Sequence, residues 1–114
     1  MKIKLGLLFL FSFGINAFGR SARTISDSSV SINGPLYIVS NDEVEKVYFA
    51  NLEFVNGPIY VVNNEKLNSV SFPKLKYVNG PIYISYNDLL ESAKFSEKLY
   101  VNGPFYYYMN EIKP

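Results

Sequence analysis

Tyrosines and carboxylates recur at a fixed spacing, and they are the side chains of this chain best suited to chemistry. The tyrosines are 23 residues apart, at Tyr37, Tyr60, Tyr83 and Tyr106. The carboxylates follow them with the same period, at Asp42, Glu65, Asp88 and Glu111. A phenol offers a ring and a hydroxyl for binding, whereas clustered carboxylates offer oxygen ligands to calcium. The two columns therefore raise two hypotheses, a binding face and a metal site.

The acidic column is a weak candidate for a metal site. Calcium takes six to eight clustered oxygen ligands, and each repeat supplies one acid at this position. Lys46 and Lys66 lie near these acids in the sequence. We interpret the column as a solvated edge and predict no metal site.

Enzyme chemistry finds no support in the composition. The chain has no histidine and no cysteine. No glycine-rich phosphate loop is present, and no serine has a base partner that would activate it. A carboxylate pair remains the alternative, although a residue repeated in every copy is an unusual choice for an active site. We therefore predict no catalytic residues, no cofactor and no enzyme activity.

The first 19 residues are typical of a secretory signal. Lys2 and Lys4 precede an apolar run over residues 5–13, and Ala17 and Gly19 offer small residues for cleavage after either position. The run is shorter than the ~20 residues of a membrane span. We predict a cleaved signal at 1–19, with an uncleaved anchor as the alternative. The mature chain then has no transmembrane span and is secreted or extracytoplasmic, at the cell surface, in the wall or in the periplasm.

The charge of the chain argues against a nucleic-acid partner. The whole sequence carries a formal net charge of +1, and removal of residues 1–19 leaves nine basic against ten acidic residues. A nucleic-acid-binding surface requires a clear basic excess.

An internal repeat organises everything after residue 31. The hexapeptide VNGPIY occurs twice, and the variants INGPLY and VNGPFY keep the same 23-residue spacing. We number each copy from the Asn of Asn-Gly-Pro, so that the tyrosine is position 5. Apolar residues flank it at positions 4 and 6 and recur at 12, 15, 17, 20 and 23. Over three copies, Lys98 is the one exception among these sites, and Leu99 beside it can replace it through a local slip.

The alternation around the tyrosine predicts a strand with one buried face. A single copy cannot bury its apolar positions, whereas stacked copies share a core. We therefore predict a mainly β solenoid of 23-residue coils with parallel strands at positions 4–8 and a second strand near 15–17. Residues 20–31 form an N-terminal cap, in which Val30 and Ile32 can form a partial strand. Residues 32–114 form three full repeats and a final strand.

An asparagine at position 9 ends every predicted strand. The four residues are Asn41, Asn64, Asn87 and Asn110. A buried amide supplies two donors and two acceptor lone pairs, enough to satisfy backbone groups of neighbouring coils. We predict a structural asparagine ladder, and ligand binding by these amides is the alternative.

Residues 72–87 read FPKLKYVNGPIYISYN. This rhythm resembles the receptor L-domain type of leucine-rich repeat, as found in growth-factor receptors and fungal cell-wall surface proteins. The resemblance covers residues 32–110. It implies a right-handed, β-helix-like solenoid and an extracellular recognition or adhesion role, and it implies no catalytic residues. The chain departs from the family in its Pro after every Gly and in lacking cysteine-bonded caps.

The outer face of the main sheet is the candidate binding surface. Positions 3, 5 and 7 carry no charge in any of the four copies. The proposed ligand-binding residues are Tyr37, Tyr60, Tyr83, Tyr106, Val39, Val62, Ser85 and Tyr108. A tyrosine ladder that only stabilises the sheet is the alternative. Stacked rings hide their flat faces, so a protein or peptide partner is favoured over a carbohydrate.

The strand at 105–109 offers a second kind of contact. Exposed apolar edge strands recruit partners, and stacking of coil ends would give a heterologous contact. Self-association through this strand is therefore a second predicted kind of contact. Two functions compete: a recognition module that binds a partner through its tyrosines, and a structural protein that assembles through its ends. A fragment of a longer repeat array is a further alternative.

Overall fold

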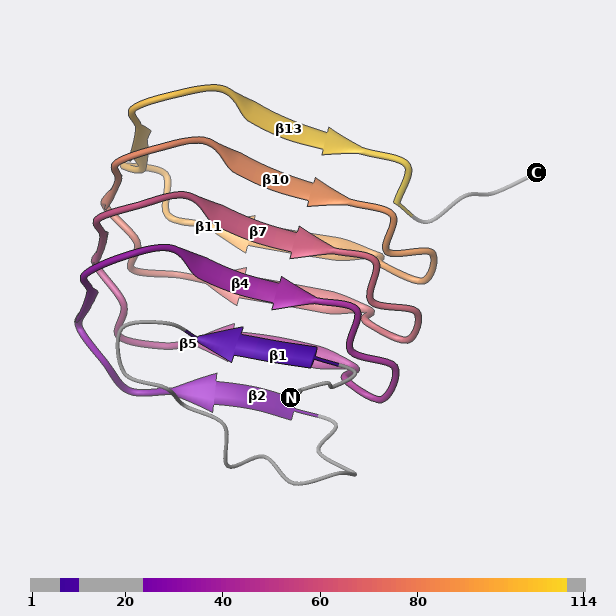
Figure 1. Cartoon of the computed structure of the whole chain (residues 1–114). Coiled ribbons are helices and arrows are strands. Elements are labelled where there is room, and N and C mark those ends of the chain that lie inside the picture. Colours follow the sequence, from indigo (N-terminus) through magenta and orange to yellow (C-terminus); the bar gives the residue numbers. More distant parts are fainter. Residues whose placement is uncertain (1–6, 11–23, 111–114) are drawn as a thin grey trace.

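The computed structural model describes residues 7–10 and 24–110. This part of the chain is all strand and turn, without a helix, and its strands form three sheets (Figure 1). Sheet A contains β1 (Leu7–Leu10), β4 (Leu36–Val39), β7 (Ile59–Val62), β10 (Ile82–Ser85) and β13 (Phe105–Tyr108). Sheet B contains β2 (Thr24–Asp27), β5 (Lys46–Phe49), β8 (Ser69–Phe72) and β11 (Ser92–Phe95). Sheet C contains β3 (Ser31–Ile32), β6 (Phe54–Val55), β9 (Tyr77–Val78) and β12 (Tyr100–Val101).

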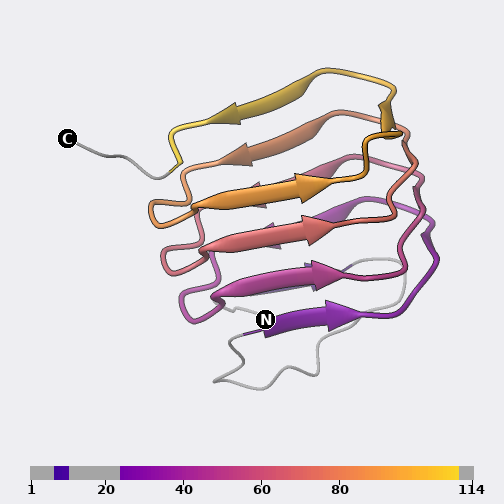
Figure 2. The same ribbon diagram turned by 180° about the vertical axis from the view of Figure 1, so that it is seen from behind.

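The coils stack in parallel with an offset of 23 residues. Leu36 pairs with Ile59 in sheet A, and Ile59 pairs in turn with Ile82. The view from behind shows the strands of sheet B stacked in the same way (Figure 2). The predicted β solenoid of 23-residue coils is confirmed, and the structure has about four turns. Sheet C, whose strands are two residues long, is not among the strands predicted from the sequence.

The apolar positions line one continuous core. All fourteen predicted core positions of the first two coils are buried. The phenylalanines at position 17 stack through this core, with ring centroids 5.2 Å apart for Phe49 and Phe72 and 5.4 Å apart for Phe72 and Phe95. Phe72 is held between the rings of the coils on either side, which is how a repeat that cannot bury its own side chains acquires a core.

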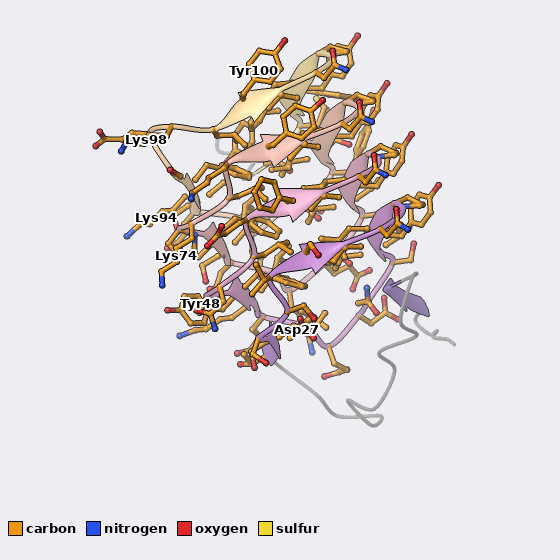
Figure 3. The ribbon with its side chains drawn as sticks, turned by 90° about the vertical axis from the view of Figure 1, so that its left-hand side faces the viewer. Asp27, Tyr48, Lys74, Lys94, Lys98 and Tyr100 are labelled. Atoms are coloured by element: carbon orange, nitrogen blue, oxygen red, sulfur yellow. The ribbon has the colours of Figure 1, made fainter. Side chains whose placement is uncertain are left out.

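The third coil departs from the pattern at position 20. Lys98 is exposed and points away from the stack (Figure 3), while Leu99 packs against the core. The turn has moved by one residue: the N–H of Leu75 bonds to the carbonyl of Phe72, whereas that of Leu99 bonds to Ser96. The expected local slip is confirmed, because a lysine at the core position would have buried an unpaired charge.

The Asn-Gly-Pro turns stack so closely that position 2 must be glycine. A Cβ on Gly57 would lie 2.7 Å from the carbonyl carbon of Gly34 and 2.8 Å from the nitrogen of Pro35. Both atoms are backbone, so the contact could be relieved only by moving one coil away from the next.

Each strand of sheet A after β1 is followed by a left-handed residue at position 8. Ser40, Asn63, Tyr86 and Met109 all have φ near +60°. This bend turns the chain inward and places the asparagine of position 9 inside the coil. This bend is not predictable from the residue types, because only asparagine among these four is common in the left-handed region.

A partial coil precedes the first complete one. In the predicted cap, residues 24–27 form β2 and residues 31–32 form β3, which extend sheets B and C by one strand each. Residues 20–23 lie outside the described part. Of the predicted signal, only residues 7–10 are described; they form β1, which runs antiparallel beside β4. The described part of the chain has no helix that is long and apolar enough to cross a membrane.

Candidate functional site

The four tyrosines of position 5 form a stacked column on the outer face of sheet A. Their ring centroids are 5.0, 5.0 and 4.8 Å apart from Tyr37 to Tyr106, and the ring planes are within 17° of parallel. The spacing follows from the sheet, because residues in register on neighbouring parallel strands are ~4.8 Å apart. The column is therefore a consequence of the repeat, and its geometry is fixed by the backbone.

Stacking decides which part of each tyrosine ring a partner could contact. The rings of Tyr60 and Tyr83 each have a neighbouring ring on both faces, and both side chains are half-buried. Tyr106 is the most open member, with 42% of its surface exposed. The column presents ring edges and a row of hydroxyls rather than flat ring faces. Such a surface can donate and accept hydrogen bonds and make edge contacts with a partner.

The predicted flanking residues differ among themselves. Val39 and Val62 are half-buried beside the column, and Tyr108 is 45% exposed. Ser85 is 3% exposed, which contradicts its expected place on the binding face. Serine is small, and its register neighbours Val62 and Tyr108 are larger, so it lies below the surface that they form.

The phenol of Tyr60 is harder to ionise than an ordinary tyrosine side chain. Burial raises the pKa of its phenol above 10.0, and the neighbouring phenols of Tyr37 and Tyr83 raise it further. All three causes oppose the phenolate. The hydroxyl of Tyr60 therefore stays protonated over the physiological pH range, where it can act as a hydrogen-bond donor.

The position 9 asparagines form the predicted ladder inside the coils. The side-chain oxygen of Asn64 accepts from the backbone N–H of Asn41 at 3.0 Å and from its side-chain amide at 3.2 Å. The Asn64 amide donates to the carbonyl of Ile38 and to the oxygen of Asn87, both at 3.0 Å. Asn87 repeats the pattern with Val61 and Asn110. These amides are engaged with their own chain, as the structural interpretation expected.

A second asparagine ladder at position 1 was missed. The side-chain amides of Asn56, Asn79 and Asn102 each donate to the side-chain oxygen one coil earlier, at 2.9–3.0 Å. An amide at one position of every coil is itself the sequence signature of such a ladder, because stacking brings each donor to the next acceptor. This ladder is exposed.

The acidic column shows no clustering. Asp42, Glu65 and Asp88 are exposed, and Glu111 lies outside the described residues. Within the described part, no three metal-ligating side chains come together. Lys66 pairs with Glu43 at 3.7 Å rather than with the acid of position 10.

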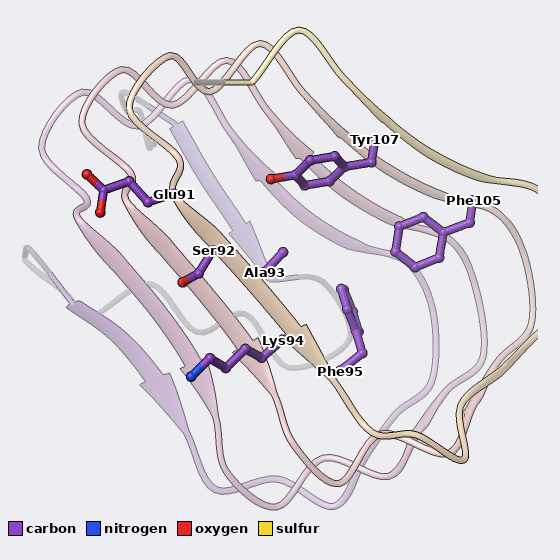
Figure 4. Close-up of a pocket in the computed structure, with 7 residues that line it drawn as sticks. All are labelled: Glu91, Ser92, Ala93, Lys94, Phe95, Phe105 and Tyr107. Atoms are coloured by element: carbon purple, nitrogen blue, oxygen red, sulfur yellow. The ribbon is translucent and has the colours of Figure 1, made fainter. Parts of the chain in front are cut away.

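Within the described residues, the core is partly exposed at the C-terminal end of the stack. Phe105, Tyr106, Tyr107, Tyr108 and Met109 are each 42–49% exposed. Phe105 and Tyr107 of β13 face Ala93 and Phe95 of β11 across a groove of about 510 Å³ (Figure 4). Two surfaces thus qualify as binding sites: the tyrosine column on the side and this groove at the end.

No protein-family model, curated protein or solved structure matches this chain.

Proposed function

We propose that this protein is a secreted or cell-surface recognition module that binds a protein or peptide partner through the tyrosine face of sheet A. The observation that supports this proposal is the stacked column of Tyr37, Tyr60, Tyr83 and Tyr106. Tyrosine is enriched in the cores of protein interfaces, where its ring packs and its hydroxyl bonds.

The column is organised before any partner arrives. Each ring is held by its neighbours at 4.8–5.0 Å, so little side-chain freedom remains to be lost on binding. Ordering an interface side chain costs about 0.5–1.5 kcal/mol, and a preformed surface avoids most of that cost. The uncharged flanks of the column also avoid the desolvation of charges.

The stacking favours a peptide over a sugar. A sugar that stacks on an aromatic residue requires a free ring face, and the faces of Tyr60 and Tyr83 are covered by other tyrosines. An extended peptide can instead lay its polar groups along the row of hydroxyls and its apolar side chains against Val39 and Val62. The resemblance to receptor L domains is consistent with an extracellular recognition role.

Selection from a displayed random-peptide library on the immobilised chain tests the proposal. The double variant Tyr60→Ser with Tyr83→Ser is expected to bind a selected peptide at least about tenfold more weakly, because central aromatic residues dominate interface energies. The control is Tyr48→Ser with Tyr100→Ser, which removes two tyrosines that are 48% and 61% exposed on other faces. Thermal unfolding confirms that both variants fold. Equal loss in both variants, or no loss in the first, contradicts the proposal.

The extracytoplasmic location has its own test. Expression of the full sequence with N-terminal sequencing of the exported chain is expected to give a first residue of Arg20, or Phe18 for the alternative cleavage. Retention of the intact chain inside the cell contradicts a secreted location and leaves the binding proposal to the peptide experiment.

A further inference from the structure

The two ends of the described solenoid are complementary: the sheets that have a strand at one end lack one at the other. At the C-terminal end, the last coil has a strand in sheet A, β13. In the described residues, this coil has no strand in sheet B beyond β11 and none in sheet C beyond β12. At the N-terminal end, the partial coil has a strand in sheet B, β2, and a strand in sheet C, β3. It has no parallel strand in sheet A beside β4. One end therefore has a strand where the other end has a vacancy.

The vacancy in sheet A at the N-terminal end is filled by β1. Residues 7–10 pair with β4 in an antiparallel register, with Phe9 opposite Tyr37 (Figure 1). All the other neighbouring strands of the three sheets are parallel. β1 therefore occupies the place of a coil strand without belonging to the repeat.

A second copy stacked head to tail would complete all three sheets. Its β2 and β3 would continue β11 and β12 of the first copy, and the first copy's β13 would take the place of β1 beside the second copy's β4. These three pairings have the same size as those between the coils of one chain, which join four, four and two residue pairs. The contact would repeat the interface that already holds the solenoid together.

The side chains at the two ends suit this contact. Phe105 of one copy would meet Leu36 of the second copy, and Ala93 would meet Ile25. At the C-terminal end, Phe105 and Tyr107 are 43% and 47% exposed beside the groove. At the N-terminal end, Ile25 and Leu36 are fully buried in the chain as it stands. The apolar side chains are therefore exposed at the C-terminal end and covered at the N-terminal end.

Asp27 is the one unfavourable member of the interface. It pairs in register with Phe49, so it stands where the other coils have the stacked phenylalanine, and it accepts a hydrogen bond from the N–H of Ser29 at 2.7 Å. In a head-to-tail contact its carboxylate would lie against Phe95. A charge that points inward at a sheet edge limits edge-to-edge association.

We propose that β1 is a removable cover, and that once it leaves β4, a second copy of this chain binds there through β13 and extends the solenoid head to tail. The contact is heterologous and does not close, so it gives short filaments. Residues 7–10 lie within the predicted signal, so signal cleavage would link assembly to export. This inference concerns the coil ends and is independent of partner binding by the tyrosine face.

Analytical ultracentrifugation of the full chain tests the role of the cover. The variant Leu8→Pro with Phe9→Pro removes two consecutive N–H groups from β1, one of which must point to β4 in an antiparallel pair. It is expected to form species that grow with concentration, while the unchanged chain stays monomeric. Ser12→Pro with Ile15→Pro, which lie outside β1, is the control and is expected to stay monomeric.

Substitutions at the two ends test the geometry in the proline background. Tyr107→Asp is expected to abolish assembly, whereas Tyr48→Asp, a change at a tyrosine of similar exposure on the side of the stack, is expected to preserve it. Asp27→Phe restores the phenylalanine column and is expected to raise the association constant about tenfold or more. Circular dichroism melting confirms that each variant folds.

Engineered cysteines then identify which strands meet, since the chain has no cysteine of its own. Val39→Cys and Tyr108→Cys are made separately in the proline background and mixed under oxidising conditions. Head-to-tail stacking brings position 108 of one copy beside position 39 of the other, so a mixed disulfide is expected. Disulfides between two copies of Tyr108→Cys indicate a two-fold pair and overturn the proposal, as does a proline variant that stays monomeric.

Discussion

At the scale of single residues, the buried asparagines carry out a task that few side chains could perform. Asn64 uses its oxygen to accept two hydrogen bonds from Asn41, the asparagine one coil earlier, and its amide to donate two more. One donor reaches the carbonyl of Ile38, which lies in the preceding coil. Aspartate lacks the donors, and serine is too short to span both coils. The amide therefore links three segments with no charge to bury.

Replacement of one buried amide should be costly. Asn64→Ala leaves the N–H of Asn41 and the carbonyl of Ile38 without their partner in the interior, and each such group costs about 1–3 kcal/mol. We expect the free energy of unfolding to fall by roughly 3 kcal/mol in urea denaturation. The matched control is Asn56→Ala in the exposed ladder, where water replaces the lost bonds and a loss below about 1 kcal/mol is expected. Equal losses would contradict the distinction between the two ladders.

The tyrosine column gives the protein a predictable weakness at high pH. The pKa of Tyr60 is raised in the folded state by burial and by Tyr37 and Tyr83. Above pH 10 the unfolded chain therefore loses this proton more readily than the folded chain, so stability falls as pH rises through the folded pKa. We expect Tyr60→Phe to lose less free energy of unfolding than the unchanged chain between pH 9 and 11. Between pH 6 and 8 the free energy of unfolding should change with pH in the same way for both proteins. The same change over the whole range from pH 6 to 11 would refute the prediction.

At the scale of the elements, turn packing sets the distance between coils. The strands repeat at the spacing of a parallel sheet, and the Asn-Gly-Pro turns must stack at that same spacing. Gly57 meets the backbone of Gly34 and Pro35 with no room for a Cβ. The exposed ladder of Asn33, Asn56, Asn79 and Asn102 runs beside these contacts and ties each turn to the next.

A single methyl group at this contact should disturb the stack. Gly57→Ala places a Cβ within 2.8 Å of three backbone atoms, which no side-chain rotation can relieve. Overpacking of this kind costs about 1–3 kcal/mol. The loss is measured by urea denaturation against Asn56→Ala, its neighbour in the same turn, which adds no atom. A Gly57→Ala chain as stable as that control would show that the coils can separate freely.

The elements also show what a sequence can and cannot reveal. The stacked core was predictable because a fixed period makes every apolar position of one coil lie over the same position of the next. The left-handed bend at position 8 was not, since Tyr86 and Met109 adopt it under the constraint of the coil and against their own preference. Sheet C was missed because two-residue strands leave too short an alternation to detect.

The candidate site was predictable in part for the same reason. The tyrosine column follows from the period alone, and so does the asparagine ladder. The burial of Ser85 depends on the sizes of Val62 and Tyr108 in neighbouring coils, and the alternation within one strand carries no information about them. The place of β1 beside β4 depends on a segment outside the repeat, about which the period says nothing.

At the scale of the whole molecule, the solenoid is a linear stack whose stability differs along its length. Each coil contacts only its neighbours, so an interior coil has two interfaces and a terminal coil has one. Phe72 is fully buried between the rings of Phe49 and Phe95. Phe95 stacks on Phe72 and meets Phe105 edge-on at 5.3 Å beside the open groove.

The same substitution should therefore have different costs along one column. Phe72→Ala removes a ring enclosed on both sides and is expected to cost about 3–5 kcal/mol, the range for a fully buried phenylalanine. Phe95→Ala removes a ring that is already partly solvated, and we expect less than half of that loss. Hydrogen exchange is expected to follow the same gradient, with the amides of β7 and β8 protected longer than those of β11 and β13. Exchange at one common rate would mean that the coils unfold as a single unit, and the end of the stack would then be no weaker than its middle.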